Sequence, residues 1–210
     1  RRTGPGTNTY IVGTERHAVI EPGVRNREHL RAVLDATNGD IDWILVTHTH
    51  PDHSPGAWTL AEATGARVHS HPLDLQGSRD KRFRHDMDLN EGDVLECAEF
   101  RLRCLYTPGH AVNHLCYLNE YTGDLIAGDQ LMEGGTVVIA PPDGDMAAYI
   151  DSLERLKTEP LRRILPAHGA PLMPPNQVID AVIAHRMRRE GKVLEALAAI
   201  GRPVTGLGLV

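Results

Sequence analysis

A short segment of the chain carries four potential metal ligands within six residues. His48 and His50 are two positions apart, so in an extended segment both imidazoles point to the same side. Asp52 and His53 follow Pro51, which forces a turn and lets them face the same space from another direction. The segment therefore offers two imidazoles to one metal ion, and a carboxylate and an imidazole to a second. Such ligands suit zinc, and also iron or manganese.

Three later residues of ligand type follow predicted strands in the same way. His110 comes after the predicted strand 100–106, Asp129 after the strand 125–127, and His168 after the strand 163–165. In each case a loop that contains glycine or proline separates the strand from the residue. Parallel placement at strand ends would assemble one site at a sheet edge from distant parts of the sequence.

The spacing of apolar residues, and the glycines and prolines between apolar segments, predict the strands and helices that position these residues. We predict further strands over 8–12, 17–20, 41–47, 67–70, 94–97 and 115–118, and a polar, irregular stretch over 72–90. We predict helices over 27–36, 57–63, 146–157 with Asp145 as the N-cap, and 177–200. The last would form one or two helices, weakened at Gly191 and stopped by Gly201-Arg202-Pro203. Strands in runs with helices interspersed predict a layered α/β sandwich with mixed sheets.

Composition narrows the function classes. The chain has 210 residues, a formal net charge of −6, 12 histidines and few aromatic side chains. No apolar run approaches the roughly 18 residues of a membrane span, so we expect no membrane partner. The surplus of acid weighs mildly against nucleic acid. Cys97, Cys104 and Cys116 show no paired spacing, which favours buried reduced thiols and a cytoplasmic location.

These motifs strongly resemble those of the metallo-β-lactamase superfamily. Its HxHxDH hallmark is matched at residues 48–53, and its later motifs by His110, Asp129 and His168. The stretches 144–156, 166–169 and 185–186 look like the lactamase-beta-2-like, glyoxalase II-like subgroup. The resemblance implies a four-layer αββα sandwich over residues 1–175. It also implies that residues 176–210 begin a helical, winged-helix-like C-terminal domain. Because the chain starts at Arg1 and ends on an apolar run, we expect both ends to be cut and this second domain to be truncated.

The resemblance also implies a ligand set for two divalent metal ions. One ion would be held by His48, His50 and His110, the other by Asp52, His53 and His168, with Asp129 as the bridge. We expect Asp52, Asp129 and His114 to be the catalytic residues, and His114 would either support the ligands from behind or face the substrate. Family members more often carry aspartate where Glu21 stands, which leaves the role of this carboxylate open.

The implied chemistry is hydrolysis. Two metal ions about 3.5–4 Å apart hold a bridging hydroxide that attacks a carbonyl carbon or a phosphorus. Zinc is the expected metal, with iron or manganese as alternatives. The preferred substrate is a small ester or thioester, including acyl-CoA or acyl-carrier thioesters. The alternative is a metal-dependent endoribonuclease or phosphodiesterase. Asp129 stands where the main clinical zinc lactamases place a cysteine, which argues against a dedicated antibiotic hydrolase. The sequence leaves the oligomeric state open.

Overall fold

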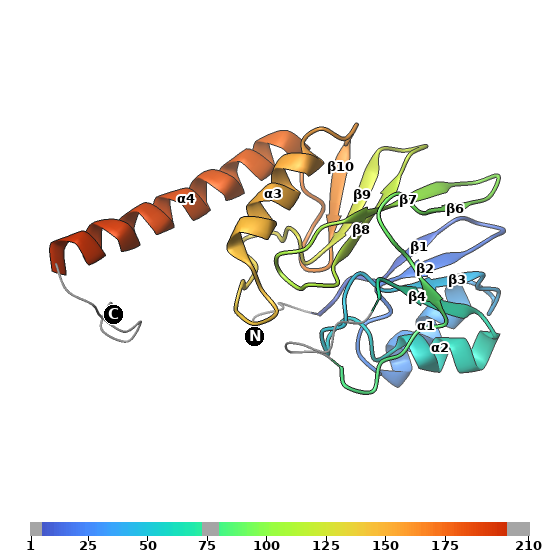
Figure 1. Cartoon of the computed structure of the whole chain (residues 1–210). Coiled ribbons are helices and arrows are strands. Elements are labelled where there is room, and N and C mark those ends of the chain that lie inside the picture. Colours follow the sequence, from blue (N-terminus) through green and yellow to red (C-terminus); the bar gives the residue numbers. More distant parts are fainter. Residues whose placement is uncertain (1–5, 73–79, 201–210) are drawn as a thin grey trace.

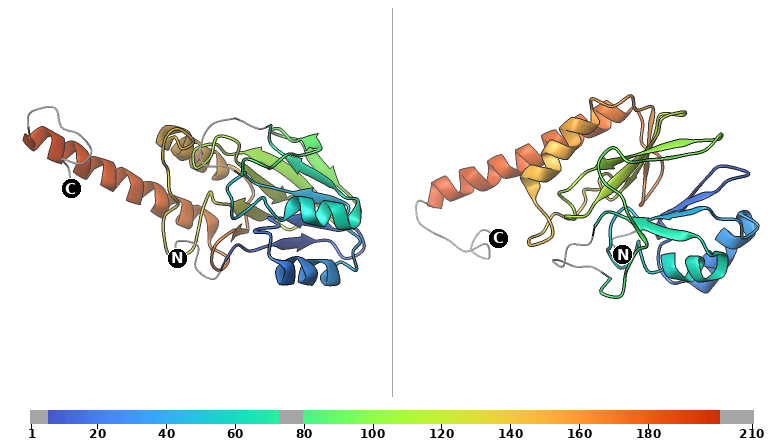
Figure 2. Two further views of the ribbon diagram at one scale, coloured as in Figure 1. Left: turned by 90° about the horizontal axis from the view of Figure 1, so that it is seen from below. Right: turned by 45° about the vertical axis from the view of Figure 1, so that its right-hand side comes forward.

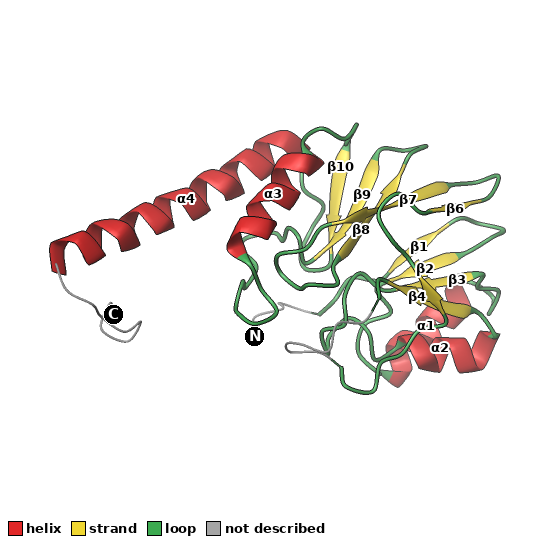
Figure 3. Cartoon of the chain, in the orientation of Figure 1, coloured by secondary structure: helices red, strands yellow, loops and turns green. Residues whose placement is uncertain are grey.

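Two five-stranded sheets pack face to face, and a pair of helices covers the outer face of each (Figures 1 and 3). The computed structural model describes residues 6–72 and 80–200. Gly201-Arg202-Pro203, predicted to stop the last helix, therefore lies outside the described residues. The fold class is the predicted α/β sandwich with mixed sheets.

The first sheet has the order β1-β2-β3-β4-β5. Its strands are β1 (Tyr10–Val12), β2 (Ala18–Ile20), β3 (Trp43–Leu45), β4 (Arg67–Ser70) and β5 (Met87–Asp88). β1 pairs antiparallel with β2, and the remaining pairs are parallel. Helices α1 (Arg27–Ala36) and α2 (Ala57–Thr64) connect the central parallel strands. Asn26 begins α1 by accepting hydrogen bonds from the amides of Glu28 and His29.

The second sheet has the order β10-β9-β8-β7-β6. Its strands are β6 (Val94–Glu96), β7 (Arg101–Tyr106), β8 (Leu115–Asn119), β9 (Asp124–Gly128) and β10 (Arg163–Pro166). β6 to β9 form an antiparallel meander, and β10 returns parallel to β9 after helix α3 (Met146–Leu156). Asp145 caps α3 as predicted. Helix α4 (Pro175–Ile200) follows β10.

Three apolar clusters hold these four layers together. One lies between the first sheet and its helices and includes Ile44, Leu60 and Val68. The second fills the space between the sheets around Phe100 and Tyr117. The third joins the second sheet to α3 and α4, and its buried members include Leu118, Leu125, Leu153, Leu156, Ile164 and Ile179. Each sheet is thus buried on both faces, which fixes the register of its strands.

Helix α4 is a single helix of 26 residues, and Gly191 does not interrupt it. One glycine costs a helix only about 1 kcal/mol relative to alanine, and strong helix formers flank it here. Val178, Val182 and Ile183 pack on the third cluster, while the later turns project away from the sandwich (Figures 1 and 2). The domain boundary at residue 175 stays a prediction.

The stretch 72–90, predicted to be irregular, includes a strand at Met87–Asp88, among its described residues, that the sequence did not reveal. β5 has only two residues, both exposed, and it forms the edge of the first sheet beside β4. Such a short edge strand carries no hydrophobic alternation to read. Among the described residues, no helix has both the length and the apolarity to cross a membrane.

Candidate metal centre

Four strands end at the same edge of the sandwich and deliver the candidate ligands there. The segment 48–53 follows β3, His110 follows β7, Asp129 follows β9 and His168 follows β10. The carboxyl ends of strands that run in one direction meet at one edge, the usual place of a site in open α/β sheets. Two hydrogen bonds join the sheets beside the site, from the Leu115 amide to the Thr47 carbonyl oxygen (2.8 Å) and from the Tyr117 hydroxyl to the Val46 carbonyl oxygen (2.9 Å).

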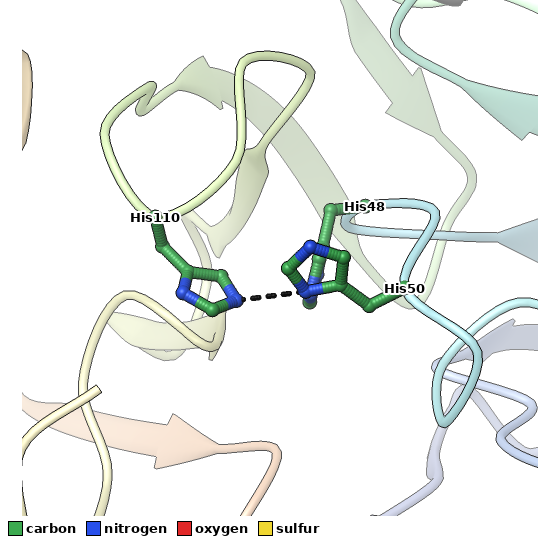
Figure 4. Close-up of side chains that lie close together, drawn as sticks. All are labelled: His48, His50 and His110. Atoms are coloured by element: carbon green, nitrogen blue, oxygen red, sulfur yellow. Dashed lines mark hydrogen bonds between the residues drawn. The ribbon is translucent and has the colours of Figure 1, made fainter. Parts of the chain in front are cut away.

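Three imidazoles converge in the first ligand group. His48 Nε2 and His110 Nε2 each lie 3.0 Å from His50 Nδ1. Figure 4 shows His110 reaching from its own loop toward the pair that follows β3. All three ligand atoms lie within 4.8 Å of one another, close enough to hold one ion. The two sheets therefore contribute to the same group.

Contacts behind these rings determine where their lone pairs point. His110 Nδ1 donates to the Val138 carbonyl oxygen (2.6 Å), and His50 Nε2 donates to the Asp143 carboxylate (2.9 Å). A neutral imidazole that donates from one nitrogen has an acceptor at the other, and in His110 that acceptor, Nε2, points toward His50. Burial lowers the pKa of His48 well below its ordinary value and also lowers that of His110, so both rings are neutral near pH 7. A divalent cation between the three rings could accept these lone pairs.

The second ligand group contains one carboxylate and two imidazoles. Asp52 Oδ1 lies 3.6 Å from His53 Nε2, and Asp52 Oδ2 lies 3.5 Å from His168 Nε2. Both rings are again held from behind, because His168 Nδ1 donates to the Gly6 carbonyl oxygen (3.0 Å) and His53 Nδ1 donates to the Glu21 carboxylate. Carboxylate–histidine contacts of this kind orient metal ligands.

Asp129 lies between the two groups and contacts both. Its Oδ2 lies 3.4 Å from His110 Nε2 and 3.6 Å from His53 Nε2, and its Oδ1 lies 3.3 Å from His168 Nε2. Burial alone would raise the pKa of Asp129, but the neighbouring histidines, His53 first, outweigh burial and lower it. The carboxylate is therefore ionised and lies beside ligand atoms of both groups.

The donor set fits divalent cations. Three of its buried atoms have no hydrogen-bond partner among the described residues: His53 Nε2, Asp129 Oδ1 and His168 Nε2. An orphaned buried polar atom is costly, and these three face the interior of the cluster. The set of five imidazoles and two carboxylates matches what zinc, iron or manganese accept. The structure thus brings all seven predicted ligands together.

Glu21 is a site residue whose role the sequence left open. Its side chain is fully buried, and its carboxylate accepts hydrogen bonds from the Thr47 amide (2.8 Å) and from His53. Burial acts to lower the pKa of His53, but the Glu21 and Asp129 carboxylates outweigh it and raise that pKa well above its ordinary value. The signal available in the sequence was a carboxylate directly after the apolar strand that ends at Ile20.

Asp143 is a site residue that the sequence analysis missed. Its Oδ1 accepts from the Val112 amide (3.0 Å) while its Oδ2 accepts from His50. Burial would raise the pKa of Asp143, but the hydrogen bond from His50 outweighs it and lowers that pKa. No sequence signal distinguished Asp143 from other loop aspartates, because its partner lies 93 residues away in the chain.

His114 supports the site from behind. The ring is fully buried, with Nδ1 2.9 Å from the Thr107 hydroxyl and Nε2 accepting from the Asp129 amide at 3.2 Å. Of the two predicted roles for His114, this placement favours support of a ligand over contact with substrate. The backbone at residue 128 can lie this close to His114 and Thr47 because the residue is glycine. A Cβ there would lie 2.7 Å from His114 Nε2 and 2.5 Å from Thr47 Oγ1.

A cavity of about 760 Å³ opens over the ligands. One wall contains His50, Asp52, His110, Asp129 and His168. The loop from Met132 to Asp143 also lines the cavity, with mostly apolar residues: Met132, Val137, Val138, Ala140, Pro141 and Pro142. A polar centre beside an apolar wall can hold a reacting group at the centre and an apolar substituent against the wall.

The cysteines supply no alternative nucleophile at this centre. Burial raises the pKa of both Cys104 and Cys116 to about 12, so these thiols remain protonated. All three cysteines are free, and Cys104 and Cys116 are buried as predicted, but Cys97 is only partly buried, so the prediction of burial was wrong for it. The arrangement can therefore hold a divalent cation and present it to a substrate, without a covalent intermediate on Cys104 or Cys116.

Comparisons with known proteins agree with this geometry. The family model described as "Metallo-beta-lactamase superfamily" matches residues 2–168. The chain is 28% identical to the "Atrochrysone carboxyl ACP thioesterase AacuM" of Aspergillus aculeatus over 93% of this chain and 61% of that protein. It is also 28% identical to the "Beta-lactamase-like protein 2 homolog" of Caenorhabditis elegans over 91% of this chain and 65% of that protein. The chain thus spans a little less than two thirds of these relatives.

Two solved structures share the fold. The metallo-beta-lactamase family protein TTHA1429 from Thermus thermophilus aligns with a TM-score of 0.77 and 24% identity, over 97% of this chain and 81% of that one. The protein TTHA1623, whose structure was solved in a di-iron-bound form, aligns with a TM-score of 0.69 and 29% identity, over 85% of this chain and 95% of that one.

Proposed function

The chain belongs to the metallo-β-lactamase superfamily, and from that premise we propose that it is a dinuclear metal-dependent hydrolase of a small thioester or ester. The observation that carries the proposal is the position of Asp129. Its carboxylate contacts His110 of one ligand group and both His53 and His168 of the other. A buried carboxylate between two groups of inward-facing donors serves two ions better than one.

The ions would supply Lewis acidity and a hydroxide nucleophile at neutral pH. The chain supplies the rest. Its imidazoles are held in fixed orientations, so the ligands need no rearrangement when the ions bind. The apolar loop with Val137 and Val138 would hold the acyl group over the centre and exclude water around it.

Thioesters are the favoured substrate class for two reasons. A relative that covers most of this chain is named as an acyl-carrier-protein thioesterase. The part of the cavity lining that the loop 132–142 contributes is mostly apolar, which suits an acyl chain better than the charged backbone of RNA. We propose zinc as the metal, with iron as the nearest alternative because TTHA1623 carries two iron ions. The start of a second helical domain at residue 176 and a cytoplasmic location belong to this proposal as well.

The test is a parallel assay on one preparation. It would offer a thioester, a lactone, a β-lactam, a phosphodiester and single-stranded RNA to the purified chain. We expect thioester turnover that a chelator abolishes and that added zinc or iron restores. Chelator-sensitive turnover of RNA alone would overturn the proposal in favour of the endoribonuclease alternative.

A further inference from the structure

A second cavity adjoins the first on the side of α4. It measures about 450 Å³ and shares Val137 and Val138 with the cavity over the ligands. Ile139 and Met146 continue its wall, and α4 forms the other side. The two residues common to both cavities thus form a ridge between the metal centre and α4.

This ridge is fixed from both sides by two successive carbonyl groups. The Val138 carbonyl oxygen accepts from His110, a candidate metal ligand. The Val137 carbonyl oxygen accepts from the guanidinium of Arg186, whose carbon lies 5.5 Å from the centre of the Tyr149 ring. A molecule lying across the ridge would therefore have one end at the ligands and the other at α4, over a backbone that does not need to move.

The α4 side of the second cavity carries positive charge without a compensating ion pair. Arg186, Arg189, Glu190 and Val193 line it, at the spacing of one helix face. Glu190 offsets one of the two guanidinium charges, which leaves one positive charge in the lining. Within the described part of the chain, none of the salt bridges involves Arg186 or Arg189. An exposed guanidinium beside an apolar groove suits an anionic group on a largely uncharged chain.

We propose that this second cavity binds the phosphate end of a phosphopantetheine-type thiol carrier while the acyl group occupies the first cavity. The inference rests on the proposed function and deepens it by naming the thiol half of the thioester. Arg189 would pair with the phosphate, and the apolar side chains of Ile139, Met146 and Val193 would contact the arm that leads to the sulfur. The thioester carbon would then lie over the ligands, on the other side of the ridge.

Binding can be tested without any turnover. Isothermal titration of the metal-loaded chain with 4′-phosphopantetheine and with pantetheine compares two ligands that differ only in the phosphate. We expect the phosphorylated ligand to bind about tenfold more tightly, as one charge-assisted contact allows. The preference should disappear in Arg189→Ala and persist in Arg188→Ala, a neighbouring exposed arginine that does not line the cavity. Equal binding of both ligands to the unmodified chain, or equal losses in the two variants, would overturn the proposal.

Turnover separates this proposal from the proposed function. The same acyl group is offered on N-acetylcysteamine, on CoA and on a phosphopantetheinylated carrier domain. Hydrolysis of none of them would contradict the thioesterase function, whereas the titration above reports on the phosphate site by itself. If the site is correct, Arg189→Ala lowers the ratio of kcat/KM between the phosphate-bearing substrates and the N-acetylcysteamine thioester by about tenfold, mainly through KM. An unchanged ratio contradicts the site. Whether CoA or the carrier domain is the better substrate identifies the source of the phosphate.

Discussion

The two sheets contribute to the candidate metal centre in different ways. After β3, the first sheet supplies four candidate ligands from a single loop of six residues, 48–53. The second sheet supplies three candidate ligands, His110, Asp129 and His168, from three separate loops. Yet each metal group needs both sheets, since His110 joins His48 and His50 while His168 joins Asp52 and His53.

The difference lies in what holds each half in place. The ligands after β3 share one backbone turn, in which the His53 amide donates to the His50 carbonyl oxygen (3.0 Å). The ligands of the second sheet depend on hydrogen bonds between loops, such as the Ala167 amide to the Gly128 carbonyl oxygen (2.9 Å). The positions of the residues in the loop 48–53 are therefore set by one short segment. The positions of His110, Asp129 and His168 are set only once the strands of the sandwich have assembled.

Removing one ligand from each half gives the largest expected effect. Asp52→Ala and His110→Ala should each lower the metal content from two ions per chain toward one and reduce kcat/KM by about 10³-fold or more, since each metal contributes several kcal/mol of transition-state stabilisation. Elemental analysis and a thioester assay on the same samples measure both quantities. Full activity in metal-loaded Asp52→Ala would contradict the assignment of Asp52 as a metal ligand.

The second-largest effect is expected for the carboxylates of Glu21 and Asp143, which accept hydrogen bonds from His53 and His50. Glu21→Gln and Asp143→Asn each remove the charge behind one histidine while keeping the shape of the side chain. Each should weaken metal binding by about 10–100-fold. The larger loss is expected for Glu21, which is fully buried and also accepts from the Thr47 amide. Competition with a chelator of known affinity measures the loss. Unchanged affinity in both variants would mean that the histidines are oriented without these carboxylates.

Crowding between the sheets predicts a loss of stability. In Gly128→Ala the new methyl group would lie 2.5 Å from Thr47 Oγ1, at a backbone φ of +49°. We expect the free energy of unfolding to fall by roughly 1–3 kcal/mol, as overpacking usually costs. Gly135→Ala is the matched control, because its nearest neighbour, Met132 Sδ, lies at 3.6 Å. Urea unfolding compares the two, and equal stabilities would contradict the close contact.

The smallest expected effect is the contribution of His114 to the loss of stability at low pH. Burial lowers the pKa of His114 well below its ordinary value, so the folded ring stays neutral while the unfolded ring gains a proton below about pH 6.5. His114 should therefore reduce stability as the pH falls through that value, by at most about 1.4 kcal/mol per pH unit. Urea unfolding of the metal-free chain between about pH 7.5 and about pH 5.5 should show a steeper loss than in His114→Gln. Equal slopes would contradict a neutral buried His114.

The same contrast explains what the sequence could reveal. The site in the loop after β3 could be predicted because its four candidate ligands fall within six residues and follow an apolar strand. His110, Asp129 and His168 could be paired with it only through their position at strand ends and through the family resemblance. The α/β sandwich with mixed sheets was predicted and is confirmed, since the apolar periodicity marked nearly every strand and helix.

The features that the sequence did not reveal depend on long-range contacts. The carboxylate of Glu21 meets His53 at a separation of 32 residues, and that of Asp143 meets His50 at 93. Contacts between residues so far apart in the chain produce no recognisable motif in the sequence. The apolar wall of the cavity also depends on distant contacts, because Val138, one of its residues, accepts a hydrogen bond from His110 at a separation of 28 residues. The strand β5 was missed for the opposite reason, since two exposed residues carry too little pattern.

The most direct test of a two-metal centre is a titration of metal back into the stripped chain. Zinc or iron is added to chelator-treated protein in known equivalents, and thioester hydrolysis is followed at each step. The two ligand groups joined by Asp129 predict that activity rises until two ions are bound per chain and then stays constant. Full activity at one ion per chain, or in the stripped protein, would contradict a two-metal centre.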